Sequence, residues 1–172
     1  MNRSSMKHAI TIVLVGTAAF VCAVRANTQT RMGIASGTMV PVYQATSLLS
    51  SQLINPEELV KILQSPKVET PLVIQVGSHV LYQQAHIPGS EYIGPASGES
   101  GLQSLRKRVE SLPRNKFIVI YCGCCPWSHC PNVKPADDAL RAMGFTNVKV
   151  LYIANNFGAD WVDKGYPVAK GD

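Results

Sequence analysis

The sequence predicts an α/β domain with an open parallel sheet and helices on both of its faces. Short apolar, β-branched runs alternate along the chain with amphipathic helical segments, and this alternation favours parallel pairing of the strands. The run at 72–76 is apolar on both faces, which is typical of a strand that is buried on both sides, and residues 117–121 form the strongest strand pattern in the chain. The length of 172 residues suffices for one domain of ordinary size.

A first helix is expected directly after Asn55. Asn55 is a favourable N-cap, Pro56 suits the first helical turn, and Glu58 completes a pattern that resembles a capping box. Apolar residues at helical spacing follow between positions 59 and 63. These signals together predict an amphipathic helix with one apolar face.

The remainder of the domain continues the alternation of strand and helix. We expect strands at 72–76, 91–93, 117–121 and 148–153, and helices at 78–84, 102–112, 136–143 and 160–164. Pro113 ends the second of these helices and Gly144 closes the third. The chain has no internal repeat and no low-complexity tract, so these elements make up one domain.

Residues 1–26 have the pattern of a secretory signal peptide. Arg3 and Lys7 give a basic start, an apolar run spans 9–24, and small residues at Val24 and Ala26 fit a cleavage site. The apolar run is short for a membrane span, which needs roughly 20 residues. We therefore expect an exported protein, periplasmic or secreted, without a stable membrane span after cleavage. Retention of the segment as an N-terminal anchor is the alternative.

Residues 27–53 are rich in Ser, Thr and Gln and show no period, which predicts a tether or loosely packed lead-in before a domain at 54–172. The full chain carries a formal charge of +5, but removal of residues 1–26 leaves thirteen basic and eleven acidic residues, or +2. The pI of about 9.0 is therefore mostly a property of the targeting segment and gives no support for a nucleic-acid partner.

Four of the five cysteines crowd into nine residues, at positions 122, 124, 125 and 130. Disulfides that brace a small exported domain are spread along the chain, because they act by closing long loops. This spacing favours reactive or metal-binding thiols over structural disulfides.

The cysteine segment joins the end of the strand at 117–121 to the start of the next helix. In open parallel sheets, ligands bind at this carboxyl edge of the strands. A helix start also presents unpaired N–H groups and a partial positive charge, which stabilise a thiolate. We therefore predict that Cys122, at the end of the strand, is an ionised nucleophile.

Several short motifs follow one another in a specific order. They are Asn55-Pro-Glu-Glu-Leu, Ala85-His-Ile-Pro-Gly-Ser, Ile118-Val-Ile-Tyr-Cys, Leu140-Arg-Ala-Met-Gly-Phe, Val148-Lys-Val-Leu, and Trp161 with Gly165-Tyr-Pro-Val. Their order and spacing over residues 54–168 resemble those of the rhodanese-like sulfurtransferase domain family.

This resemblance implies a sulfurtransferase in which Cys122 is the nucleophile. In the family, that thiolate takes a sulfane sulfur from a donor such as thiosulfate, holds it as a persulfide against loop N–H groups, and passes it to a thiol acceptor. The resemblance implies no cofactor, and partners that are a small sulfur donor and a thiol acceptor. The active-site loop would comprise Cys122, Gly123, Cys124, Cys125, Trp127, Ser128, His129 and Cys130.

The loop departs from the family pattern in ways that bear on the donor. It is longer than the usual loop and contains no arginine, and Pro126 and Pro131 each remove a backbone donor. Residues 75–77 read Gln-Val-Gly where the family usually has Asp-x-Arg. Since sulfate-like anions bind arginine or free N–H groups, these changes disfavour thiosulfate as the donor.

The additional thiols leave two other functions open. Cys122 and Cys125 form a Cys-x-x-Cys as in thiol–disulfide exchangers, and Cys130 could resolve an oxidised Cys122. Alternatively, Cys122, Cys125, His129 and Cys130 could bind copper(I) or zinc. The adjacent side chains of Cys124 and Cys125 are expected to diverge, which would oppose a complete tetrahedral site.

Overall fold

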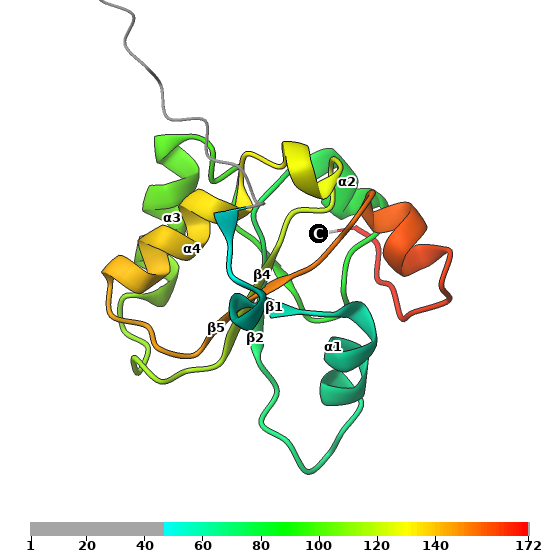
Figure 1. The fold of residues 1–172 in the computed structure, drawn as a ribbon, viewed down its shortest axis with the longest axis horizontal. Helices are drawn as coiled ribbons and strands as arrows, with labels where there is room; N and C mark the ends of the chain where they lie inside the picture. Colours follow the sequence, from blue (N-terminus) through cyan, green and yellow to red (C-terminus); the bar gives the residue numbers. More distant parts are fainter. Residues whose placement is uncertain (1–46, 172) are drawn as a thin grey trace, which may run out of the picture. The chain divides into compact units, whose positions relative to one another are not determined.

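The computed structural model describes residues 47–171, so the predicted signal peptide and most of the lead-in lie outside the described residues. Five parallel strands form the centre of this part, in the order β1-β5-β4-β2-β3 (Figure 1). They are β1 (Leu53–Ile54), β2 (Leu72–Gln75), β3 (Glu91–Tyr92), β4 (Ile118–Tyr121) and β5 (Val148–Leu151). The predicted open parallel sheet is confirmed.

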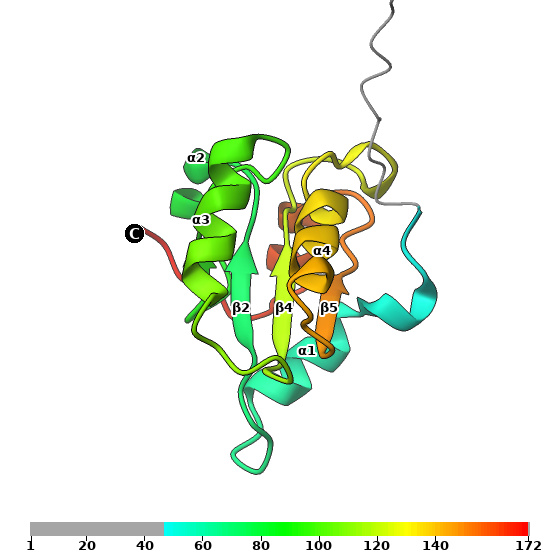
Figure 2. The same cartoon turned by 90° about the vertical axis from the view of Figure 1, so that its left-hand side faces the viewer.

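Helices cover both faces of the sheet, as the sequence predicts. The longer ones are α1 (Pro56–Leu63), α2 (His79–Gln84), α3 (Glu99–Val109) and α4 (Val133–Ala142). Three short turns of helix accompany them: η2 (Ser50–Gln52), η3 (Trp127–His129) and η4 (Gly158–Val162). Figures 1 and 2 show α3 and α4 on one face of the sheet, with α1 and η4 on the other.

The packed part of the chain extends upstream of residue 54. Leu53 pairs with Val150 of β5, and Leu48 is buried against the core. The sequence did not predict β1 because two residues are too few to show a period of two. Neighbouring β5, rather than a local pattern, positions this strand.

The central strand β4 separates two apolar clusters. Ile118 and Ile120 belong to the cluster beneath α3 and α4, whereas Val119 and Tyr121 belong to the cluster beneath α1 and η4. Because side chains alternate along a strand, the next residue, Cys122, points to the α3 and α4 side. Within residues 47–171, no helix is long and apolar enough to cross a membrane.

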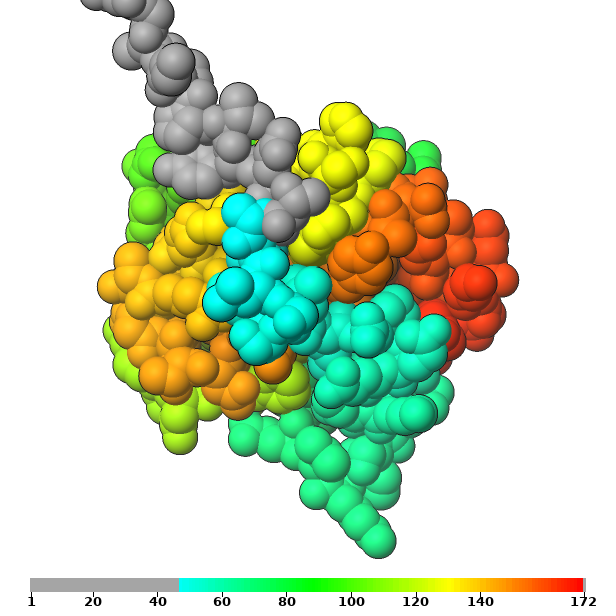
Figure 3. Space-filling view, in the orientation of Figure 1, coloured from blue at the N-terminus to red at the C-terminus, as the bar shows by residue number. Residues whose placement is uncertain are grey.

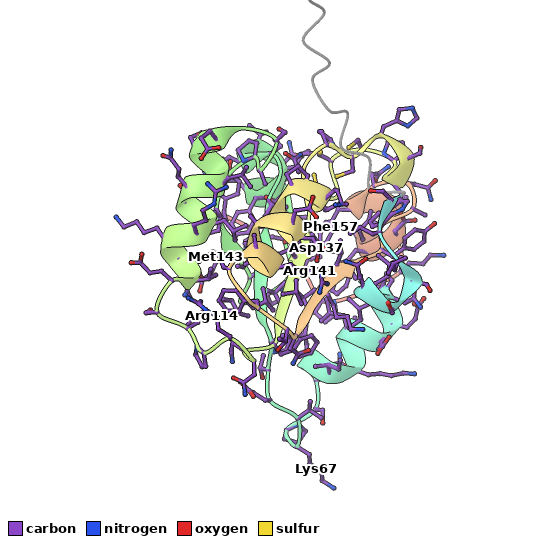
Figure 4. The ribbon with its side chains drawn as sticks, turned by 60° about the vertical axis from the view of Figure 1, so that its left-hand side comes forward. Lys67, Arg114, Asp137, Arg141, Met143 and Phe157 are labelled. Carbon is purple, nitrogen blue, oxygen red and sulfur yellow. The ribbon has the colours of Figure 1, made fainter. Side chains whose placement is uncertain are left out.

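A buried carboxylate links η2 to α4. Asp137 on α4 is 0% exposed and accepts hydrogen bonds from Gln52 (2.8 Å) and from Arg141 (2.8 Å), one turn further along the helix (Figure 4). Arg141 also donates to the carbonyl of Val148 at the start of β5. This network connects the helix, the sheet and the segment that precedes β1.

Removal of this carboxylate is expected to destabilise the domain. Asp137→Ala should lower the free energy of unfolding by about 1–3 kcal/mol, since it removes the acceptor of the partly exposed side chains of Gln52 and Arg141. Urea denaturation measures the change. Asp138→Ala is the matched control, because Asp138 forms a more exposed pair with Lys134 and should cost less than about 1 kcal/mol. Equal losses in the two variants would contradict the role given to Asp137.

Candidate active site

The end of β4 is held in place by Gln75, a buried residue of β2. Its side-chain amide donates to the carbonyl of Cys122 (3.2 Å), and its oxygen accepts from the amide of Gly77 (3.0 Å). Gly77 packs directly against the cysteine: a Cβ at this position would lie 2.7 Å from Sγ of Cys122. The departure from the family pattern at 75–77 thus leaves space for the Cys122 sulfur and supports its backbone.

A glycine then reverses the direction of the chain. Gly123 has a φ of 71°, and its carbonyl accepts a hydrogen bond from the amide of Phe157 (2.9 Å). After this turn, Sγ of Cys124 lies 3.0 Å from Sγ of Cys122, and Sγ of Cys125 lies 3.5 Å from Sγ of Cys124. The expected divergence of Cys124 and Cys125 is therefore wrong, because the turn at Gly123 bends the segment that was assumed to be extended.

The sulfur of Cys122 is enclosed. The residue is 3% exposed, and the side-chain amide of Asn132 donates to its Sγ at 3.3 Å. The oxygen of the same amide accepts from the backbone N–H of Ser97 (2.9 Å), which fixes the orientation of the donor. Asn132 directly precedes α4. The start of this helix therefore contacts Cys122 through a side-chain amide.

The negative charge is favoured at the neighbours of Cys122 instead. The pKa of Cys122 is raised by hydrogen bonding with Cys124 and with Cys130, and by burial. Hydrogen bonding with Cys122 lowers the pKa of Cys124 to about 6, with help from Cys125. It also lowers the pKa of Cys130 to about 7, together with the backbone N–H groups of Asn132 and Val133. Burial and these hydrogen bonds therefore oppose ionisation of Cys122 in the reduced cluster, whereas the sequence predicts an ionised Cys122.

This distribution of charge makes a pH dependence testable. Alkylation of Cys124 by iodoacetamide should rise as the pH increases through about 6 and then level off, because its thiolate is already formed there. An ordinary thiol, with a pKa of 9.0, would continue to rise. Cys125 is the internal control: burial and the bond to Cys124 raise its pKa to about 12, so its labelling should increase across the whole range. Peptide mass spectrometry separates the two sites, and a Cys124 profile centred near 9 would contradict the prediction.

The remaining residues of the predicted loop form its outer wall. The amide of Trp127 donates to the carbonyl of Ala154 (3.0 Å), and its ring packs edge-on against Tyr152. Ser128 and His129 are exposed and hydrogen-bond to one another through Oγ and Nδ1 (2.8 Å). Trp127 thus closes the loop over the thiols, whereas the imidazole of His129 faces solvent.

Among the described residues, two cavities adjoin the thiols. A small inner one of about 10 Å³ is lined by Cys122, Cys125, Cys130 and Trp127, among others. A larger outer one of about 340 Å³ is lined by Cys124, by the end of α2 and by residues 156–158. Gly123 borders both cavities. Figure 3 shows the yellow surface of the cysteine loop directly beside the orange surface of the chain that follows β5.

A soft metal would find three sulfur ligands here. The Sγ atoms of Cys122, Cys124 and Cys125 all lie within 4.8 Å of one another. Of the four ligands that the sequence suggested, Cys122 and Cys125 belong to this group, and Cys130 contacts Cys122. His129 lies outside the group, and its place is taken by Cys124. Three close thiols suit copper(I) or zinc.

Sequence reasoning assigned no role in the site to Gly77, Asn132 or Phe157. A glycine directly after a buried strand is a signal for close approach, and an asparagine before a helical pattern is a signal for a helix start. Both signals are present at Gly77 and Asn132, but neither indicates contact with Cys122. The contact between Gly123 and Phe157 has no local signal, since 34 residues separate the two positions.

The loop that carries the cysteines joins the central strand of the parallel sheet to a helix. This arrangement is typical of a class of α/β proteins that have a reactive thiol at the carboxyl edge of the sheet. The family model described as "Rhodanese-like domain" matches residues 55–152. The chain belongs to this family, and the resemblance inferred from its motifs is confirmed.

Solved structures with the same fold agree with this assignment. The Alr3790 protein from Anabaena sp. is 20% identical, with a TM-score of 0.52 over 68% of this chain and 82% of that chain. The BH2092 protein from Bacillus halodurans is 22% identical, with a TM-score of 0.54 over 70% and 77%. At these identities the likeness concerns the fold. No curated protein matches the chain.

Proposed function

We propose that this protein is an exported sulfurtransferase that carries sulfane sulfur as a persulfide on Cys122. One observation supports this above others: Cys122 directly follows the central strand β4, where the family resemblance implies the nucleophile, and it lines a cavity of about 10 Å³. A cavity of that size holds about one water-sized atom. It therefore suits the single additional sulfur of a persulfide, beside the Asn132 amide donor.

The outer cavity favours a donor of low charge. Among the described residues that line it there is no lysine or arginine, and Leu81, Phe157 and Val162 make much of its wall apolar. A doubly charged thiosulfate would have no cationic partner there. We therefore propose that the donor is a small organic persulfide or a polysulfide, and that the acceptor is a thiol.

Mass spectrometry of the intact protein tests this function. After incubation with cysteine persulfide and desalting, the reduced protein should gain the mass of one sulfur atom, and an added thiol should remove it. Peptide mapping after alkylation should place the sulfur on Cys122. Failure of the protein to gain sulfur from both cysteine persulfide and inorganic polysulfide would overturn the proposal.

Export is a separate part of the proposal and rests on residues 1–26. Expression of the full chain in a host with a secretory pathway should yield a mature protein that begins close after Ala26. The intact mass of the product and the compartment in which it accumulates measure this. A full-length product in the cytoplasm would contradict export without affecting the sulfur chemistry.

Binding of copper(I) or zinc is the second candidate function, and the closeness of three Sγ atoms, all within 4.8 Å, favours it. Reduced protein exposed to either metal and then desalted should retain it in a one-to-one ratio if this function holds. Titration against a copper(I) chelator would give the affinity. Absence of retained metal would remove this candidate.

A further inference from the structure

The proposed persulfide on Cys122 raises a problem of access. Cys122 is 3% exposed, and the cavity next to its sulfur has a volume of about 10 Å³. That volume admits about one water-sized atom, whereas any sulfane donor carries several heavy atoms. In the described part of the chain, the donor-sized cavity of about 340 Å³ is lined by Cys124 and not by Cys122.

We propose that Cys124 is the entry thiol, which takes the sulfane sulfur from the donor and passes it to Cys122. This inference rests on the proposed function and adds a second catalytic residue to it. Cys124 borders the outer cavity, and its Sγ lies 3.0 Å from Sγ of Cys122, within the 4.0 Å range of sulfur hydrogen bonds. The turn at Gly123, which borders both cavities, holds the two sulfurs in this position.

The first transfer takes place in the outer cavity. The Cys124 thiolate attacks the outer sulfur of a donor R–S–SH, a new S–S bond forms on Cys124, and the S–S bond of the donor breaks. The thiolate R–S⁻ leaves with the electron pair of that bond. Cys124 now carries the persulfide, and no external oxidant or reductant is consumed.

The second transfer moves the same sulfur inward. The Cys122 sulfur attacks the outer sulfur of the Cys124 persulfide, the bond from that sulfur to Cys124 breaks, and Cys124 leaves with the electron pair. The proton of the Cys122 thiol passes to the departing Cys124 thiolate, whose Sγ lies 3.0 Å from Sγ of Cys122 in the reduced cluster. One S–S bond forms and one breaks, so the step is balanced.

The environment of Cys122 favours this inward position. The two persulfides contain the same bonds, so their surroundings decide which of them is populated. At Cys122 the added sulfur occupies the inner cavity, which Trp127 helps to line, and lies away from external thiols. Cys124 thus serves for entry and Cys122 for storage.

Two single variants test this order of transfer and act as controls for each other. With cysteine persulfide as the probe, acid quenching at short times and peptide mapping, Cys124→Ser should slow sulfur uptake about 100-fold or more. Cys122→Ser should still take up sulfur, with the sulfur on Cys124, and should be slowed far less than Cys124→Ser. Cys124→Ala repeats the first measurement, and circular dichroism of each variant verifies folding.

The possible results distinguish a failure of sulfur transfer through Cys124 from a failure of the proposed sulfurtransferase function. Wild-type uptake rates in both Cys124 variants would overturn the transfer of sulfur through Cys124. Cys122 would then take the sulfur directly from the donor. A disulfide between Cys122 and Cys124 with release of sulfide would show attack on the inner sulfur and would overturn the second step. No uptake by the wild-type protein would instead overturn the proposed function itself.

Discussion

Replacement of Cys122 by serine is expected to abolish the stable storage of sulfur. Without the Cys122 thiol, sulfur taken up at the outer cavity remains on Cys124, which is partly exposed, so an added thiol such as glutathione can remove it. The lifetime of the protein-bound sulfur should fall about 100- to 1,000-fold, because loss of the group that forms the covalent intermediate removes the main contribution to its persistence.

The measurement is the decay of the added sulfur mass after a pulse of cysteine persulfide and a chase with glutathione. Cys125→Ser is the comparison, since it removes a thiol from the same loop and should retain more of the stored sulfur than Cys122→Ser. If both variants lose sulfur at the same rate, storage is a property of the whole cluster and not of Cys122.

The fold follows from signals that lie within short stretches of the sequence. Residues 118–121 are apolar because both faces of β4 are covered, and Asn55 with Pro56 defines the start of α1. Such periods and caps are local, so a single sequence contains them. Strands that form only by pairing with another strand cannot be predicted from such local signals. An example is β1, which has two residues and is a strand only because it pairs with β5.

In the candidate site, too, the sequence predicts some features and not others. The position of Cys122 follows from topology, because ligands of open parallel sheets bind at the carboxyl ends of the strands. The distribution of charge does not follow from topology. It depends on which sulfur donates to which, and on the N–H groups of Asn132 and Val133 reaching Cys130 rather than Cys122. These contacts exist only once the loop has closed.

Gly123 is the residue on which that closure depends most. Its φ of 71° lies in the left-handed region, and a Cβ added there would lie 2.7 Å from Cβ of Phe157. Gly123→Ala therefore combines backbone strain with a clash against a buried side chain. We expect the free energy of unfolding to fall by about 2–4 kcal/mol, from roughly 1 kcal/mol of strain and the cost of overpacking.

Gly165→Ala separates these two contributions. Gly165 has a similar φ of 74°, but an added Cβ there meets nothing within 4 Å. This control should lose only about 1 kcal/mol by urea denaturation. Gly123→Ala should also separate the sulfurs of Cys122 and Cys124 and thereby slow the appearance of sulfur on Cys122, whereas Gly165→Ala should not. Equal stabilities for the two variants, with normal uptake in both, would show that the loop closes without the turn at Gly123.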